Sequence, residues 1–331
     1  MDAPVTTRQA TIGDLPAMAA LLLADAKRKA AREPGLRSVA DDAEARIEDT
    51  LLLALEAEPQ PLRQGWILAE HAGVVVGVGH SVLVPVPPIY AGRWGEPGLL
   101  MPDCTVSDDA PEETLDFLLD AAEADMQAAG ATVLLASSVE GERWGPRLQA
   151  RGYRDLTLYL AKVGFKPAKP HSPVRRAVEQ DVPGIVSRSA ENRALLEALH
   201  SFWTRHPDAD HRFSEWMSHS LTLADRDMLV LGRGEDLVGY IIAQPASRLH
   251  FPAAHEISRT GIIDDFYSRD LADALRLGDT GEAFSLLSAA EQAFATRGMV
   301  SALVVCPAAW TSKRSVLEDA GYGVSMTWMI K

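Results

Sequence analysis

The sequence has only two cysteines, no long apolar run and a shortage of basic side chains. Cys104 and Cys306 lie far apart, so neither a disulfide framework nor a Cys-x-x-Cys zinc or redox motif is available. The longest apolar stretches, such as Val74–Val78, are far too short to span a bilayer, and the first residues lack the basic start and apolar segment of a secretory signal. These absences favour a cytoplasmic protein with no membrane partner, because a reducing compartment suits free thiols.

The shortage of basic side chains limits the partners of the chain. Lys and Arg number 32 against 46 Asp and Glu in 331 residues, which gives a formal net charge of −14. Nucleic-acid binding needs a basic surface, so the sequence predicts no nucleic-acid partner. The acidity suits a cationic small molecule, although it also serves ordinary solubility. The content of hydrophobic residues, 47%, suffices for about two packed domains.

An internal repeat is the most informative pattern that is present. Residues 118–123 read Leu-Leu-Asp-Ala-Ala-Glu, and residues 286–291 read Leu-Leu-Ser-Ala-Ala-Glu. Gly130 and Gly298 each follow the first leucine of their segment by twelve residues. Each segment therefore predicts an amphipathic helix that ends at a glycine, before a short apolar strand.

Further segments recur in the same order in both halves. They are an Asp-x-Pro near the start (Asp14 and Asp181), a glycine between two β-rich runs (Gly77 and Gly239) and a closing Gly-Tyr (Gly152 and Gly321). Each half predicts the order β–α–(α)–β–β–β–α–β–α–β, which indicates a mixed α/β sheet with helices on both faces. The predicted boundaries are a first domain over 1–165, a proline-rich linker over 166–173 and a second domain over 174–331.

This ordered series resembles the GNAT superfamily of N-acetyltransferases, repeated in tandem over nearly the whole chain. The resemblance implies two GNAT-like acyl-CoA N-acyltransferase domains. In such a domain the fourth strand ends in a bulge and splays from the fifth, so that the pantetheine arm fits between them. The next loop and helix N-terminus bind the pyrophosphate, as free backbone N–H groups and the helix dipole favour. The resemblance also implies direct transfer from acetyl-CoA or another acyl-CoA to an amine, with no metal and no covalent intermediate.

The second copy contains the predicted acyl-CoA site. Its fourth strand includes Asp264 and Asp265, of which one is predicted to take a proton from the acceptor amine, with His255 and Glu256 as the next candidates. The residues predicted to hold the co-substrate are Phe266, Tyr267 and Ser268 at the thioester and Gly278, Asp279, Thr280, Gly281, Glu282 and Ala283 at the pyrophosphate. The family pattern in this loop is Gln/Arg-x-x-Gly-x-Gly/Ala, to which Gly281 and Ala283 conform and Gly278 does not. An ordinary turn with a capping residue is the alternative.

The first copy lacks this loop pattern. Its equivalent stretch, Val106–Leu115, has no glycine and is rich in carboxylates, which would repel a pyrophosphate. We therefore predict that the first copy is degenerate for CoA and serves packing or substrate shaping. Arg28, Lys29 and Arg32 are predicted to form a small solvated basic face of a helix.

Both copies depart from the family at the position of the general acid. Leu148 and Leu317 stand where a tyrosine is usual, and Gly141 and Trp310 stand where an asparagine is usual. Since leucine cannot protonate a thiolate, either another group or water does so, or the chain is a non-catalytic protein that binds a ligand or a partner chain.

The prediction is an N-acyltransferase for a small amine or an amino-acid-derived metabolite, with a homodimer as a further expectation. The histidines and aspartates of 206–211 match no trusted zinc spacing, so no metal is predicted.

Overall fold

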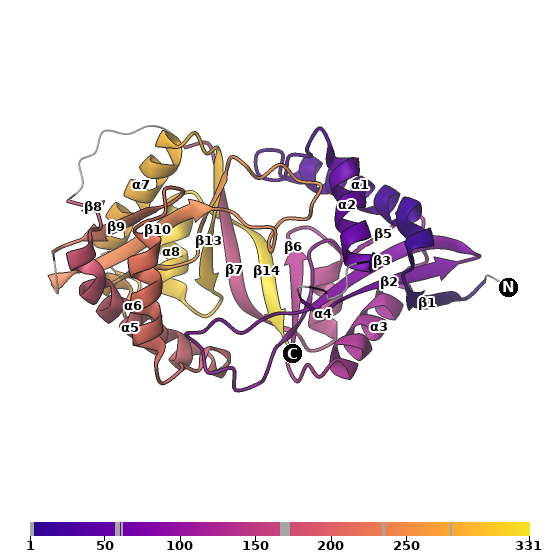
Figure 1. The fold of residues 1–331 in the computed structure, drawn as a ribbon, viewed down its shortest axis with the longest axis horizontal. Coiled ribbons are helices and arrows are strands. Elements are labelled where there is room, and N and C mark those ends of the chain that lie inside the picture. Colours follow the sequence, from indigo (N-terminus) through magenta and orange to yellow (C-terminus); the bar gives the residue numbers. More distant parts are fainter. Residues whose placement is uncertain (1–2, 57–59, 61, 166–172, 234–235, 279) are drawn as a thin grey trace.

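The computed structural model describes residues 3–56, 60, 62–165, 173–233, 236–278 and 280–331, and Figure 1 shows their arrangement. The elements of the first copy are β1 (Val5–Gln9), α1 (Leu15–Arg32), α2 (Ala43–Glu56), β2 (Gln64–His71), β3 (Val74–Leu83), β4 (Gly98–Leu100), β5 (Thr105–Val106), α3 (Thr114–Ala128), β6 (Leu134–Val139), α4 (Trp144–Ala150) and β7 (Arg154–Val163). Residues 166–172 of the predicted linker lie outside the described part of the chain.

The second copy repeats this order. Its elements are β8 (Arg175–Arg176), α5 (Val182–Leu199), α6 (Ala209–Ser220), β9 (Asp227–Leu231), β10 (Gly239–Pro245), β11 (Thr260–Ile263), β12 (Phe266–Ser268), α7 (Gly281–Thr296), β13 (Ser301–Pro307), α8 (Thr311–Asp319) and β14 (Gly323–Ile330). The predicted helix stops are confirmed, because Gly130 and Gly298 follow α3 and α7 with φ of 98° and 72°. This left-handed conformation favours glycine over residues that have a Cβ atom.

Helices cover both faces of the sheet, as the sequence predicts. Alternate residues of β2 show this directly. Trp66 and Leu68 belong to the hydrophobic cluster of α1 and α2, whereas Ile67 and Ala69 belong to the cluster of α3. Successive side chains of a strand point to opposite faces, so one apolar strand supports helices on each side.

The two copies exchange their last strands. The strand order is β1-β2-β3-β4-β6-β14-β7-β13-β11-β10-β9-β8, so β14 of the second copy lies beside β6 of the first and β7 of the first lies beside β13 of the second (Figure 1). Thr157 to Val163 pair with Pro307 to Ser301, and Met326 to Ile330 pair with Val139 to Leu135. The result is one continuous mixed sheet through both copies.

The exchange places side chains of each copy in the core of the other. Leu158 and Leu160 of β7 belong to the cluster that holds α7 and α8, and Met329 of β14 belongs to the cluster that holds α3 and α4. Burial of such a side chain stabilises a fold by about 1.5–3 kcal/mol. Neither core is therefore complete with the residues of one copy alone. The boundaries 1–165 and 174–331 stay a prediction, which says where each repeat begins and ends in the sequence.

The copies also exchange long connections between strands. Residues 84–97, here the first arm, reach the second copy, where Ala91 N donates to Thr204 O at 2.8 Å and Ile89 O accepts from His206 N at 3.0 Å. Residues 246–259, here the second arm, reach the first copy, where Ala254 O accepts from Ala40 N at 2.9 Å. Each arm thereby forms a wall beside the fourth strand of the opposite copy. Within the described residues, no helix is both long and apolar enough to cross a membrane.

Candidate functional site

The fourth strand is broken in both copies, as the resemblance implies. In the first copy β4 pairs with β3 and, in parallel, with β6, whereas β5 continues along β3. In the second copy β11 pairs in parallel with β13, whereas β12 continues along β10. The strand that follows each break therefore leaves its parallel neighbour. The surroundings of the two breaks are different.

Asp264 and Asp265 form the break of the second copy, between β11 and β12. Asp265 accepts from Tyr240 Oη at 2.6 Å and from Asn192 Nδ2 at 3.3 Å. Asp264 accepts from Gln244 Nε2 at 3.0 Å. Burial, together with the charge of Asp265, raises the pKa of Asp264 to about 6. The two carboxylates thus have separate partners, and Asp264 is the one whose side chain is exposed to a cavity.

Protein side chains occupy the region beside β12. The Nζ atom of the buried Lys313 donates to Phe266 O at 3.0 Å and lies 5.0 Å from the ring centre of Trp310. Trp310 is fully buried, and its Nε1 donates to Leu271 O at 3.1 Å. Burial lowers the pKa of Lys313. The carbonyl of Phe266 is thus bonded within the chain, whereas the groups predicted to hold the thioester are the backbone N–H groups near Phe266–Ser268, which stay a prediction.

The N-terminus of α7 is occupied as well. Asp270 Oδ2 accepts from Glu282 N at 3.1 Å and from Ala283 N at 3.0 Å. A carboxylate thus occupies the positive helix end that was predicted to hold a pyrophosphate. Gly281 begins the helix after Thr280, and Gly278 lies in the preceding connection, while Asp279 lies outside the described residues.

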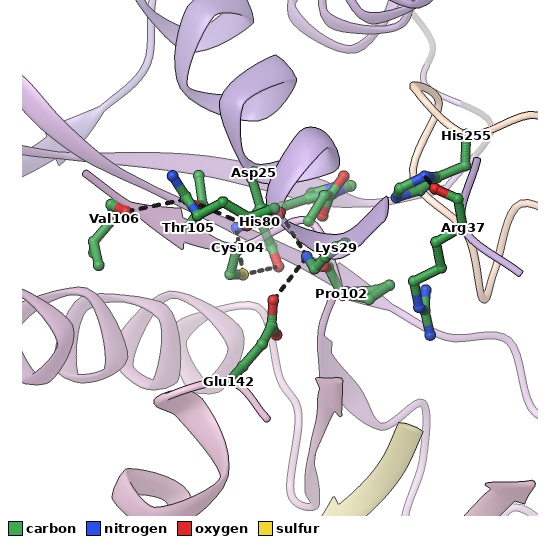
Figure 2. A network of polar contacts seen from close by, with 12 residues as sticks. Asp25, Lys29, Arg37, His80, Pro102, Cys104, Thr105, Val106, Glu142 and His255 are labelled. Atoms are coloured by element: carbon green, nitrogen blue, oxygen red, sulfur yellow. Dashed lines mark hydrogen bonds and ion pairs between the residues drawn. The ribbon is translucent and has the colours of Figure 1, made fainter. Parts of the chain in front are cut away.

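At the break of the first copy, residues 101–104, α1 provides a buried ammonium group (Figure 2). Lys29 Nζ donates to Pro102 O and to Asp25 Oδ2, the latter at 2.6 Å, and lies 3.3 Å from Glu142 Oε1. Burial alone would lower the pKa of Lys29, but the charges of Asp25 and Glu142 outweigh burial and raise it. The predicted solvated face is therefore wrong for Lys29, whose side chain is fully buried.

An arginine-lined cavity of about 470 Å³ adjoins this break. Its walls are α1, β5, the start of α3 and the segment that leads into α4, and its arginines are Arg28, Arg32 and Arg143. Arg28 Nη2 donates to Thr105 Oγ1 at 2.8 Å and to Val106 O at 3.3 Å. Arg143 is exposed and forms no ion pair within the described chain. Asp25, Asp108 and Glu142 also line the cavity, and Arg28 pairs with Asp25 and Asp108 while Arg32 pairs with Glu142. Arg143 is therefore the guanidinium of this cavity that suits a phosphate-bearing ligand without first leaving a carboxylate.

A second cavity, of about 650 Å³, is lined by residues of the break itself, and we call it the dyad cavity. His80 Nδ1 lies 2.9 Å from Asp103 Oδ1, and His80 Nε2 lies 3.2 Å from Gln64 Oε1. The ring of Trp66 stacks on the imidazole with centres 3.8 Å apart. Burial alone would raise the pKa of Asp103, but the charges of His80 and Lys29 outweigh burial and lower it. Asp103 is therefore ionised beside the imidazole at neutral pH.

Between these cavities lies a small central chamber. It shares Asp25 with the arginine-lined cavity and Asp103 with the dyad cavity. His255 reaches it on the second arm, where Nδ1 donates to Arg37 O at 3.0 Å. Burial lowers the pKa of His255 to about 4, so the ring is neutral at neutral pH. His255 Nε2 and Trp66 Nε1 are buried without a hydrogen-bond partner in the described structure, so the chamber offers one acceptor and one donor.

Other predicted residues have structural partners. Glu256 accepts from Ser258 N at 2.7 Å and from Arg46 Nη2 at 3.2 Å, and Asp210 pairs with Arg193 at 2.6 Å. Leu148 and Leu317 are fully buried. Within the described residues, no group of three His, Cys, Asp or Glu side chains is placed to hold a metal ion.

The sequence reasoning overlooked His80 and did not connect it with Asp103. One signal was available, because His80 is the single ionisable side chain in the apolar stretch 74–84. The pairing with Asp103 had no such signal, since it depends on how β3 lies beside the broken strand.

Comparisons with known proteins agree on the fold. No protein-family model matches the sequence, and no curated protein matches it. Among solved structures, a GCN5-related N-acetyltransferase from Sphaerobacter thermophilus is similar over 99% of this chain and 95% of its own, with 16% identity and a TM-score of 0.58. A tandem GNAT protein from the clavulanic acid biosynthesis pathway is similar over 99% and 97%, with 14% identity and a TM-score of 0.50. At such identities the likeness shows a tandem GNAT fold.

Proposed function

We propose that the chain is an acyl-CoA-dependent N-acyltransferase whose reaction takes place at the strand-four break of the first copy. The observation that supports this most is that two cavities adjoin one small chamber beside the break, which shares Asp25 with one of them and Asp103 with the other. One cavity presents three arginines, and the other presents a histidine–carboxylate pair. The fold that the chain shares with a GCN5-related N-acetyltransferase supports acyl transfer as the reaction.

The donor substrate would enter through the arginine-lined cavity. Arg143 would pair with its phosphates, and Arg28 and Arg32 would do so after leaving the carboxylates with which they pair, Asp25 and Asp108 for Arg28 and Glu142 for Arg32. The side chain of Glu113, at the N-terminus of α3, makes no hydrogen bond to the amides of that helix. Asp270, in contrast, accepts such a bond at the N-terminus of α7. The acidic residues nearby are partly neutralised, because Arg147 lies 2.6 Å from Glu112 and 3.2 Å from Asp116. Acetyl-CoA or a related acyl-CoA is the proposed donor.

The acceptor would occupy the dyad cavity. Asp49 and Asp103 suit its ammonium group, while Arg248, which forms no ion pair within the described chain, suits an anionic group. This combination favours a small amine that also has a carboxylate, such as an amino-acid-derived metabolite. The apolar part of the wall is formed by Val82, Leu83, Leu249 and Phe251.

Proton transfer in the proposed reaction depends on Asp103 and His80. Both ring nitrogens of His80 face acceptor oxygens, of Asp103 and Gln64, so the acceptor ammonium would give its proton to the Asp103 carboxylate, which His80 Nδ1 holds in position. The freed amine nitrogen then bonds to the thioester carbonyl carbon, the C–S bond breaks, and the thiolate leaves with the bonding electrons. The extra proton of the nitrogen passes to the thiolate, directly or through water, which gives an amide and a free thiol. Lys29 places a positive charge at the break, which stabilises negative charge that develops there.

Two alternatives follow from the sequence. In the first, the second copy binds acyl-CoA at Phe266–Ala283 with Asp264 or Asp265 as the base. The hydrogen bonds that the amides of Glu282 and Ala283 already make to Asp270 disfavour it. In the second, the protein binds a ligand without catalysis, which the absence of a tyrosine at Leu148 and Leu317 favours.

The test compares matched aspartates at the two breaks. Thiol release from acetyl-CoA would be followed with a panel of amino acids and simple amines, for the parent chain, Asp103→Asn and Asp264→Asn. We expect kcat/KM to fall about 100-fold in Asp103→Asn and to stay within about 3-fold in Asp264→Asn. The reverse pattern would place the reaction in the second copy. CoA binding without thiol release from any acceptor would support the non-catalytic alternative.

A further inference from the structure

The central chamber beside the break of the first copy has a volume of about 20 Å³, and both copies form its walls. The first copy provides residues of α1, α2 and β2 together with Asp103, and the second copy provides residues 252–255 of the second arm. A cavity of about 10–15 Å³ is large enough to hold one water molecule. The chamber therefore has room for about one water, and the proposed acyl transfer makes no use of it.

Two ring nitrogens at the chamber are buried without a hydrogen-bond partner in the described structure, Trp66 Nε1 and His255 Nε2. Trp66 is 3% exposed and His255 is 0% exposed. His255 Nδ1 lies 3.0 Å from the carbonyl oxygen of Arg37, so Nδ1 carries the proton of the neutral ring and Nε2 is an acceptor (Figure 2). An indole nitrogen can only donate. Because a buried polar group without a partner destabilises the fold, both nitrogens favour a polar occupant of the chamber.

The two nitrogens and the charges of the wall select the chemistry of that occupant. A metal cation or an ammonium ion cannot accept a hydrogen bond from Trp66, and an apolar molecule would leave both nitrogens unpaired. An anion would be repelled by the carboxylates of Asp25 and Asp103, which also line the chamber. Water both donates and accepts, and its size matches the chamber.

We propose that the chamber binds one water molecule, which accepts from Trp66 Nε1 and donates to His255 Nε2. The carboxylates of Asp25 and Asp103 lie in the same wall as acceptors for its second hydrogen. About three hydrogen bonds are typical of a buried water. The water thereby joins β2 of the first copy to the second arm, which belongs to the second copy.

This water would tether the second arm where direct bonds also hold it. Ala40 N donates to Ala254 O at 2.9 Å, and Glu256 N donates to Ser38 O at 2.9 Å, so direct bonds to the first copy lie on both sides of His255. The same arm forms part of the wall of the dyad cavity. A tethered arm keeps that wall in place, whereas the binding of the water itself does not depend on acyl transfer.

Nuclear magnetic resonance of the full chain with isotope-labelled tryptophan tests the proposal. A long-lived water beside Trp66 gives its indole proton a cross-peak at the water frequency, with opposite signs in laboratory-frame and rotating-frame experiments. Chemical exchange of the indole proton gives equal signs. We expect the signature of opposite signs at Trp66 and not at Trp310, which is fully buried and whose Nε1 donates to Leu271 O at 3.1 Å. Absence of the signature at Trp66 would overturn the proposal.

Matched replacements of His255 locate the water. His255→Gln places an amide oxygen near the position of Nε2 and should keep the signature at Trp66, whereas His255→Phe removes the acceptor and should lose it. His250→Phe, on the same arm, should keep it, because His250 lines the aromatic cavity, a separate space of about 330 Å³ beside Asp264. An unchanged signature in His255→Phe would place the water elsewhere and overturn the proposal. If His255→Phe does not fold, the comparison of Trp66 with Trp310 in the parent chain still decides.

Amide hydrogen exchange tests the tether. The amides of Ala40 and Glu256 should exchange about 5-fold faster in His255→Phe than in His255→Gln, because only the glutamine keeps an acceptor for the water. Both replacements remove the imidazole Nδ1 that bonds to Arg37 O, so the comparison between them reports on the second ring nitrogen. Equal exchange rates in the two variants would overturn the tether.

Discussion

The two strand-four breaks share a fold and differ in what surrounds them. In the first copy a buried ammonium, Lys29, is held by two carboxylates, and cavities open beside it. In the second copy a buried ammonium, Lys313, bonds directly to the strand after the break, and Asp270 caps the helix that follows. The difference shows that a GNAT-like loop pattern does not by itself identify the copy with the open site. Asp270 accepts hydrogen bonds from amides at the N-terminus of α7, where the loop pattern predicts a phosphate.

The largest expected effect comes from separating the copies. Residues 1–165 and 174–331, produced as separate chains, should each fail to give a cooperative unfolding transition, because each lacks the strand that completes its sheet. Produced together, they should form a one-to-one complex that unfolds cooperatively. Circular dichroism during urea titration, with sedimentation to establish mass, checks this. A monomeric half with its own cooperative transition would show that the exchange is dispensable.

The two buried lysines should differ in their contribution to stability. Lys29→Met leaves Asp25 and Glu142 buried with weaker counter-ions and should lower the free energy of unfolding by about 3 kcal/mol. Lys313→Met removes one hydrogen bond to a carbonyl and should cost about 1 kcal/mol. Urea unfolding of both variants measures the difference. Equal losses would mean that the carboxylates around Lys29 find other partners.

Stability should also fall in acid because of two histidines on the second arm. Burial lowers the pKa of His250 and His255 to about 4, from an ordinary value of 6.5. Between these values the unfolded chain binds more protons than the folded chain, so the free energy of unfolding decreases as pH falls from 6.5 toward 4, by roughly 2 kcal/mol for each histidine. Asp264, whose pKa is raised, acts in the opposite direction.

Matched variants separate these contributions to the pH dependence. His255→Gln, at the central chamber, and His250→Gln, at the aromatic cavity, should each remove about half of the loss in acid. Chemical unfolding at a series of pH values provides the measurement. An unchanged slope in either variant would show that the imidazole concerned becomes protonated freely in the folded state.

The smallest expected effect concerns CoA affinity. Arg143→Ala removes an exposed guanidinium from the arginine-lined cavity and should raise the Kd of CoA about 10-fold. Gly281→Glu adds a carboxylate at the start of α7 and should leave the Kd within about 2-fold of the parent value, because no phosphate is expected there. Calorimetry decides between the copies, since the reverse result would assign CoA to the second one.

Much of the fold could be predicted from short-range patterns. The repeated helices, the β2–β3 and β9–β10 hairpins and the glycine stops after α3 and α7 are all present. The candidate site was less accessible to such reasoning. Lys29 was expected in solvent, and His80 was not considered, because its role depends on Asp103 in a different strand. The predicted carboxylate Asp264 does line a cavity, but one that the first arm helps to form.

The sequence by itself determined the local elements and their order, since helix periodicity, strand alternation and left-handed glycines depend on residues a few positions apart. Tertiary structure decided which strands each last strand pairs with, which side chains surround each break and which charges are buried. These outcomes depend on contacts between residues far apart in the chain, such as Lys162 with Ala302 in the exchanged strands and Arg37 with His255 at the chamber. Two copies with the same local pattern can therefore share a fold, while their long-range packing leaves them with different sites.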